Sequence, residues 1–189
     1  MSNNHQHLPG NHPALDNPRH RMRLMAIRIR TMVSMGLPVN VYSIVDEMTV
    51  VNNDKSYKVI CSNLADPELK GLYRFDAGLQ CYVIGINLDK LSEAERRFYV
   101  ALGLGMVVTG ALPMDGQHAV PVKGFSTLLD VLNPENPGSY LLMDFACELI
   151  APEMDFLFLK SLGHPYPAIG KIMDVPIEVI QYMRDQQAH

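Results

Sequence analysis

The feature that most limits how this chain can fold is one long apolar segment that follows a helix start signal. Ser92 and Glu95 have the spacing of a capping box, which predicts a helix from there to about Thr109. Residues 98–114, a run of 17, carry no charge, but three glycines and Pro113 interrupt them. Such a run is too short and too broken to span a bilayer. It therefore predicts a buried helix around which the remaining elements pack.

The segments before this helix predict both helices and strands. Apolar residues recur every three or four positions over 19–35 and predict a first helix. Asn40 is suited to cap a short second helix over 41–48. The segments TVVNN and SYKVICS are rich in β-branched residues and favour strands.

A β-hairpin and several further helices complete the predicted elements. The segments LKGLYRF and LQCYVIGIN flank Asp76-Ala77-Gly78 and predict a hairpin, with the glycine at a left-handed turn position. Residues 111–138 are rich in proline and glycine and predict an irregular excursion. A helix is expected from near Ser139, and two short helices over 168–184 are separated at Asp174-Val175-Pro176. The predicted class is α+β, with a small antiparallel sheet of about three or four strands packed on a helical bundle.

Charge is distributed unevenly along the chain. The net charge is −4, but residues 1–40 hold five arginines and one acidic residue, which gives +4 there and leaves −8 for the rest. The arginines are Arg19, Arg21, Arg23, Arg28 and Arg30. They predict a basic surface, which is either a solvated helix face, the commoner case, or a contact for nucleic acid or an acidic protein.

The sequence predicts a single domain preceded by a flexible tail. We expect residues 1–18 to form a flexible polar tail and residues 19–189 to form a single domain. The polar N-terminus lacks the pattern of a signal peptide, which indicates a cytoplasmic address.

Two motifs resemble those of a known enzyme family. The segments ERRFYVALGLGMVVTG and MDFACELIAPE resemble the ImmA/IrrE family of small zinc metallopeptidases, whose central helix usually reads RFTLAHELGH and whose following helix reads ExxANxFAxxLLxP. Framework positions of both motifs are matched by Arg97, Phe98, Ala101, Leu104 and Gly105, and by Phe145, Ala146, Leu149, Ile150 and Pro152. LPVNVYSIVDEM and KGLYRFDAGLQCYVIGIN are similar to the family's preceding helix and hairpin. The resemblance spans residues 36–185 and implies a minimal zincin-like domain.

The residues that carry the family's chemistry are replaced. The resemblance puts the two zinc-binding histidines at Leu102 and Met106, the general-base glutamate at Gly103, and the third ligand at Ser139. Leucine has no lone pair, a thioether is too soft for zinc in this setting, and glycine has no side chain that can transfer a proton. We therefore expect a pseudopeptidase with no catalytic residue, metal or cofactor, whose former metal pocket is filled by hydrocarbon. Because glycine costs about 1 kcal/mol in a helix interior, we also expect a neighbour to pack closely against Gly103.

Other polar residues allow alternative sites. A displaced metal site could use His118 or His164 with Asp144, Glu148 or Glu153. However, carboxylates four residues apart, such as Asp144 and Glu148, are more typical of a solvated helix face.

The two C-terminal helices have the apolar spacing of a helix-turn-helix. Their cations are Lys171 and Arg184, and Asp174, Glu178 and Asp185 lie among them. Phosphate contacts would therefore be few, and a packing helix pair is favoured over a DNA contact.

The resemblance implies a regulatory role, because members of the family relieve repression in prophages and mobile elements by cutting helix-turn-helix repressors. We expect a catalytically inactive regulator of a phage or mobile element that binds a repressor or another protein without cleaving it. The expected contacts are the vacated positions, Leu102, Gly103, Met106 and Ser139, and the basic first helix. The alternative is a nucleic-acid-binding transcriptional regulator that uses the arginines and the C-terminal pair. Residual enzymatic activity at another site is disfavoured, no membrane partner is expected, and self-association is left open.

Overall fold

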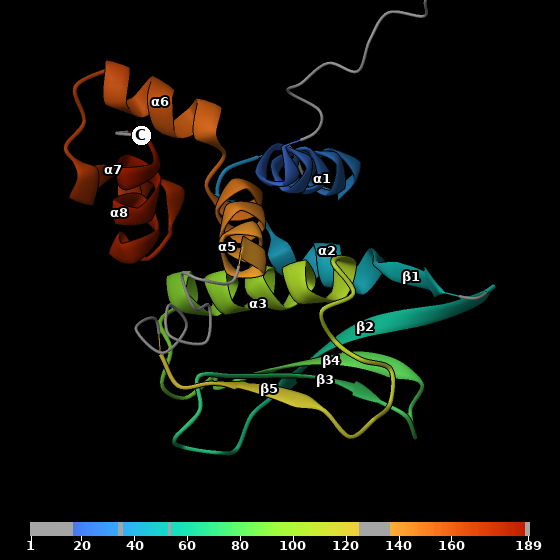
Figure 1. Ribbon diagram of the computed structural model, residues 1–189. Coiled ribbons are helices and arrows are strands. Elements are labelled where there is room, and N and C mark those ends of the chain that lie inside the picture. Colours follow the sequence, from blue (N-terminus) through green and yellow to red (C-terminus); the bar gives the residue numbers. More distant parts are fainter. Residues whose placement is uncertain (1–16, 34–35, 53, 125–136, 188–189) are drawn as a thin grey trace, which may run out of the picture.

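The protein folds as a mixed five-stranded sheet with its helices on one side. The computed structural model describes residues 17–33, 36–52, 54–124 and 137–187, with only the backbone of 137–139. The sheet has the strand order β1-β2-β4-β3-β5. Figure 1 shows α3 crossing the face of this sheet, with α5 packed above it and α6 to α8 grouped at one end. The predicted α+β class is confirmed.

The elements follow one another in two groups. The first comprises α1 (Pro18–Val33), α2 (Val41–Glu47), β1 (Thr49–Asn52), β2 (Lys55–Asn63), β3 (Gly71–Asp76), β4 (Cys81–Ile86) and α3 (Glu93–Val108). The second comprises β5 (Ala119–Val122), α5 (Pro137–Ile150), α6 (Glu153–Ser161), α7 (Tyr166–Met173) and α8 (Ile177–Gln186). Within these residues no helix combines the length and the hydropathy needed to cross a membrane.

Local signals in the sequence fixed the helix starts correctly. The Ser92 side chain accepts from the backbone N–H of Glu95, and the Glu95 carboxylate accepts from the N–H of Ser92, so both halves of the capping box are present. The Asn40 side chain accepts from the N–H of Ser43 over 3.2 Å and caps α2. The hairpin of β3 and β4 is also confirmed, with Tyr73 opposite Ile84.

The turn of this hairpin differs from the prediction. The residue with a left-handed backbone is Gln80, at φ 51°, and Gly78 does not adopt that conformation. The Asp76 carboxylate accepts from the N–H groups of Gly78 and Leu79, both over 3.0 Å. The side chain of Asp76 therefore closes the turn, a role that Asp often takes in loops.

The prediction of an antiparallel sheet is wrong in one pairing, because β2 runs parallel to β4, with Val59 opposite Tyr82. Every residue of β4 is buried. A strand that is apolar throughout is best placed inside a sheet, and β4 accordingly lies between β2 and β3.

A fifth strand lies within the segment predicted to be irregular. β5 pairs antiparallel with β3, with Val120 opposite Tyr73. Its position at the edge of the sheet accommodates Pro121, which lacks a backbone donor. Residues 125–136 of the predicted excursion, and residues 1–16 of the predicted tail, lie outside the described part of the chain.

Candidate functional site

The positions that the resemblance assigns to zinc chemistry lie in the protein core. Within α3 the residues from Arg97 to Val107 are all buried. Leu102 is 0% exposed and Met106 is 3% exposed. Ser139 lies in the first turn of α5, and its side chain is outside the described residues. The three described positions belong to the packed interior, so in this conformation they offer no surface to a partner.

The expected close neighbour of Gly103 is the ring of Tyr73. A Cβ atom at Gly103 would lie 2.7 and 2.8 Å from two ring carbons of Tyr73 and 3.0 Å from the terminal methyl of Ile84. The Tyr73 ring is fully buried, and its hydroxyl donates to the carbonyl of Tyr99 over 2.9 Å. Glycine is therefore required by the approach of α3 to the sheet, and position 103 has no room for a longer side chain.

A second cluster, formed by charged residues, joins α1 to the C-terminal helices. Arg19 donates from its Nε and one terminal nitrogen to the two carboxylate oxygens of Asp144, the second over 2.8 Å. The same terminal nitrogen donates to the hydroxyl of Tyr182 and to the side chain of Gln186. The Asp144 carboxylate raises the pKa of Arg19 further above its ordinary value, mainly through these hydrogen bonds.

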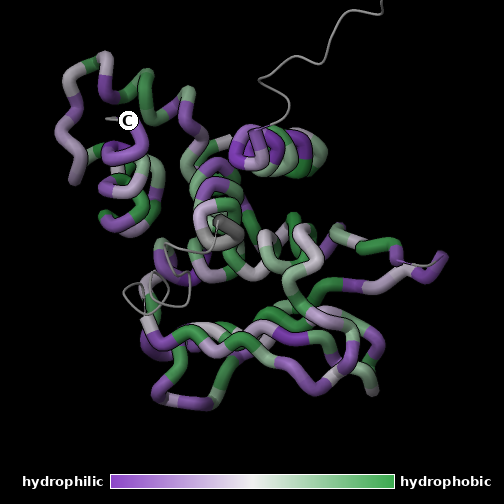
Figure 2. The backbone as a smooth tube through the Cα atoms, viewed as in Figure 1, coloured by the Kyte–Doolittle hydropathy of each residue, from purple (hydrophilic) through white to green (hydrophobic). Residues whose placement is uncertain are grey.

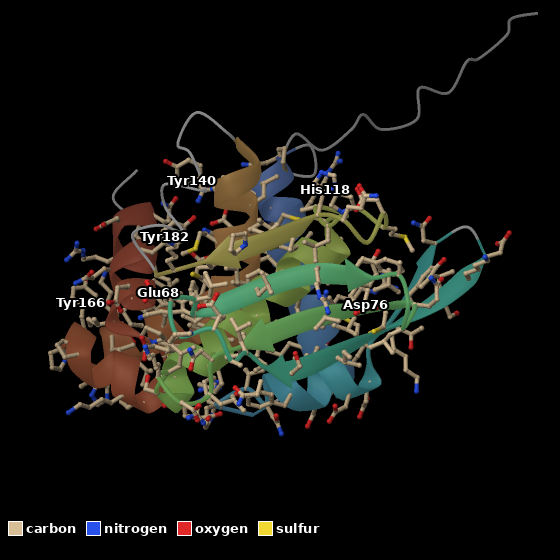
Figure 3. The ribbon with its side chains drawn as sticks, turned by 90° about the horizontal axis from the view of Figure 1, so that it is seen from below. Glu68, Asp76, His118, Tyr140, Tyr166 and Tyr182 are labelled. Carbon is tan, nitrogen blue, oxygen red and sulfur yellow. The ribbon has the colours of Figure 1, made fainter. Side chains whose placement is uncertain are left out.

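Two aromatic rings complete the surroundings of Arg19. Its guanidinium lies 5.8 Å from the ring centroid of Tyr140, a cation–π distance. Figure 3 labels Tyr140 on α5 and Tyr182 on α8 on the same side of the molecule. The Tyr182 hydroxyl donates to Asp144 over 3.1 Å, and its pKa is raised, first by burial and then by the neighbouring Asp144 charge.

Two more arginines of α1 reach acidic residues. Arg23 lies 2.7 Å from the Glu153 carboxylate and 3.6 Å from that of Asp144. Arg30 lies 3.9 Å from Asp155. Glu153 and Asp155 are in the first turn of α6, where the helix dipole favours negative charge. The predicted basic surface is therefore paired within the chain at these three positions. Arg21 and Arg28 are more exposed to solvent than these three.

The prediction that Asp144 and Glu148 form a solvated helix face is wrong. Asp144 is 2% exposed and Glu148 is 6% exposed. Asp144 contacts Arg19 of α1 and Tyr182 of α8, whereas Phe145 of the same helix packs against Gly105 of α3. The charge of Asp144 is compensated by Arg19 and Arg23, which lie more than a hundred residues away in the sequence.

Glu148 differs from the other acidic residues of the cluster. No ion pair among the described residues includes it, and its carboxylate accepts one hydrogen bond, from the N–H of Glu153 over 3.2 Å. Burial raises the pKa of Glu148 to about 7, against the opposing effects of that hydrogen bond and of the Arg30 and Arg23 charges. It also lines a cavity of about 20 Å³ with Arg23, Asp144 and Tyr182. That volume holds about one water molecule and is too small for an organic substrate.

Arg97, a framework position of the resembled family, connects α3 to the two C-terminal helices. One terminal nitrogen donates to the carbonyl oxygen of Asp174 over 2.6 Å and to its carboxylate over 2.8 Å. Its Nε donates to the carbonyl of Val39 over 3.1 Å. Asp174 ends α7 with a left-handed backbone at φ 53°. Arg97 therefore fixes the turn between α7 and α8 on the body of the protein.

The two C-terminal helices form as predicted, and their apolar faces are buried. Val179 and Ile180 of α8 are 0% exposed and pack in the core. On the exposed side, Arg184 pairs with the adjacent Asp185 at 2.7 Å, and Glu178 adds a negative charge. This surface has little positive charge to offer to phosphate.

Of the predicted site residues, the structure thus brings together Leu102, Gly103 and Met106 in the core and Arg19, Arg23 and Arg30 at the acidic residues of α5 and α6. Sequence reasoning missed Asp144 as the partner of Arg19 and Glu148 as a buried carboxylate. One signal could have identified them. They are the charged residues of an otherwise apolar helix, LLMDFACELI, which has no polar face to expose them.

Among the described residues, no group of three or more His, Cys, Asp or Glu side chains is arranged to hold a metal ion. Comparisons of the sequence with protein-family models and with curated proteins find no match.

Proposed function

We propose that this protein is a catalytically inactive, metallopeptidase-like regulator of a phage or mobile element that binds a transcriptional repressor, or another protein, without cleaving it. The observation that carries the proposal is the packing of α3. The residues at the positions of the family's zinc ligands and base are Leu102, Met106 and Gly103, and Tyr73 occupies the space beside the glycine. A side chain able to bind zinc or move a proton is absent from these three positions.

The same packing moves the expected partner contact away from the vacated positions. Leu102 and Met106 are buried, so a partner must bind elsewhere on the surface. The nucleic-acid alternative is disfavoured by charge, because Arg19, Arg23 and Arg30 already pair with carboxylates and the exposed side of α8 is not basic. With nucleic acid disfavoured by these ion pairs, a protein partner is the alternative that we retain.

The decisive experiment uses the product of the adjacent open reading frame, which we expect to be a helix-turn-helix repressor. We expect isothermal titration calorimetry to give a complex at micromolar concentration, and the repressor to stay intact after incubation with the protein and added zinc or manganese. No complex at micromolar concentration, or cleavage that a chelator prevents, would contradict the proposal. Elemental analysis of the purified protein is expected to give less than stoichiometric zinc.

A further inference from the structure

The attachment of α1 to the rest of the protein depends strongly on charge. Three of its arginines, Arg19, Arg23 and Arg30, contact an acidic face formed by Asp144 and Glu148 of α5 with Glu153 and Asp155 of α6. The arginines are spaced by four and seven residues, so they lie along one side of the helix. Figure 2 shows α1 with hydrophilic and hydrophobic residues alternating along its length.

The apolar part of this attachment is small. Of the sixteen residues of α1, Met22 and Ala26 are buried. In α3, which has the same length, eleven residues are buried. Leu24, Met25 and Met32 of α1 are exposed, at 41%, 39% and 69%. An element with few buried apolar contacts opens before the core does, so α1 is expected to open before α3.

The match between α1 and the acidic face is also incomplete. The face carries four carboxylates, whereas α1 supplies three guanidinium groups. Among the described residues no ion pair includes Glu148, although that residue is 6% exposed and lines the small cavity. Between Arg23 and Arg30, α1 buries Ala26, which has no charge. A helix with a cation in this interval would satisfy the face better than α1 does.

We propose that the acidic face of α5 and α6 is a binding site for a basic amphipathic helix, which α1 occupies within the chain and which the basic helix of a protein partner occupies when α1 is displaced. The inference rests on the proposed function, since it names the chemistry of the partner. Proteins that bind DNA commonly carry helices rich in arginine and lysine. Such a helix would place its cations on Asp144, Glu148 and Glu153, and small apolar residues against α5.

The main test measures binding of a fluorescein-labelled peptide with the sequence of residues 17–33 to the full chain by anisotropy at low salt. In the wild type the tethered α1 competes at an effective concentration in the millimolar range. The double variant R19A/R23A weakens this competitor, so we expect it to bind the peptide at least tenfold more tightly than the wild type. The variant R28A, which changes an exposed arginine of the same helix, is the matched control and is expected to behave like the wild type.

Two further arms show whether the peptide binds the acidic face. Adding D144N and E153Q to the double variant is expected to reduce peptide binding at least tenfold, and 0.5 M salt is expected to weaken it as well. The inference would be overturned if the peptide bound the wild type and R19A/R23A with equal affinity, or bound neither. It would also be overturned if D144N and E153Q left the affinity for the peptide unchanged.

A measurement on the unmodified protein guards against misfolding of the variants. Amide hydrogen exchange is expected to be at least tenfold faster in α1 than in α3, and faster still in 0.5 M salt. Equal exchange rates in the two helices would overturn the inference. A repressor that binds wild type and D144N/E153Q equally refutes the inference alone, whereas peptide binding without any repressor complex refutes the proposed function alone.

Discussion

Replacing Gly103 by alanine sets two opposing effects against each other. Alanine in a helix interior is favoured over glycine by about 1 kcal/mol. The added Cβ, however, would lie 2.7, 2.8 and 3.0 Å from three heavy atoms of Tyr73 and Ile84. Carbon atoms pack best at about 3.5–4.0 Å. Overpacking of this kind costs about 1–3 kcal/mol, and three simultaneous short contacts with a fully buried ring place the cost in the upper part of that range.

We therefore expect G103A to lower the free energy of unfolding by about 2 kcal/mol, and the melting temperature by about 4–8 °C. Urea denaturation followed by circular dichroism measures the first quantity directly. The matched control is G170A in α7, where a Cβ would be 3.4 Å from Ile180, an ordinary contact, so this change should be neutral or stabilising by up to about 1 kcal/mol.

A double-mutant cycle tests the cause of the loss. The variant Y73L replaces the aromatic ring by a smaller side chain and so removes the close contact. In that background G103A should lower the free energy of unfolding clearly less than in the wild type. If G103A stabilised the protein as much as G170A does, the close approach of Tyr73 would be refuted, and with it the conclusion that there is no free space beside Gly103.

Three other predictions concern the buried residues Glu148, Arg97 and Leu102. Because the pKa of Glu148 is raised to about 7 in the folded state, that state holds a proton that the unfolded chain releases near pH 4.5, so stability should fall as pH rises from about 4.5 to 7 and level off above. E148Q should remove this loss, on the order of 3 kcal/mol in urea melts at pH 8, whereas E178Q on the exposed side of α8 should leave it. R97A should destabilise by about 2–4 kcal/mol and R97K only partly rescue it, because lysine lacks the fork that reaches both Val39 and Asp174; equal stability of the two variants would contradict this role. L102A should cost about 2–5 kcal/mol in thermal melts, and a melting temperature that shifts on adding zinc or a chelator would contradict a hydrocarbon-filled pocket.

The failed interpretation of Asp144 and Glu148 shows where sequence reasoning stopped. A spacing of four residues places two side chains on one face of a helix, but it does not state what covers that face. In the structure the cover is α1, whose Arg19 is 125 residues away from Asp144 in the chain. The cost of burying Asp144 is offset by that distant guanidinium, together with Arg23 and the hydroxyl of Tyr182.

The strand order could not be predicted from the sequence for a similar reason. The hairpin of β3 and β4 was predictable, since a short turn joins two apolar segments. The place of β4 beside β2, by contrast, depends on which strand buries the most apolar surface at the centre of the sheet. β5 was missed because Pro121 weakens the strand signal, and only the free edge of β3 allows that residue to pair.

The sequence by itself determined the helix starts at Ser92 and Asn40, the apolar stripe that makes α3 central, and the absence of polar side chains at Leu102, Gly103 and Met106. These features depend on hydrogen bonds and side-chain spacing within a few residues, which any reader of the chain can evaluate. Only the tertiary structure decided that Tyr73 fills the space beside Gly103 and that the arginines of α1 pair with α5 and α6. Those contacts join residues far apart in the chain, and their free energy exists only once the whole core has packed.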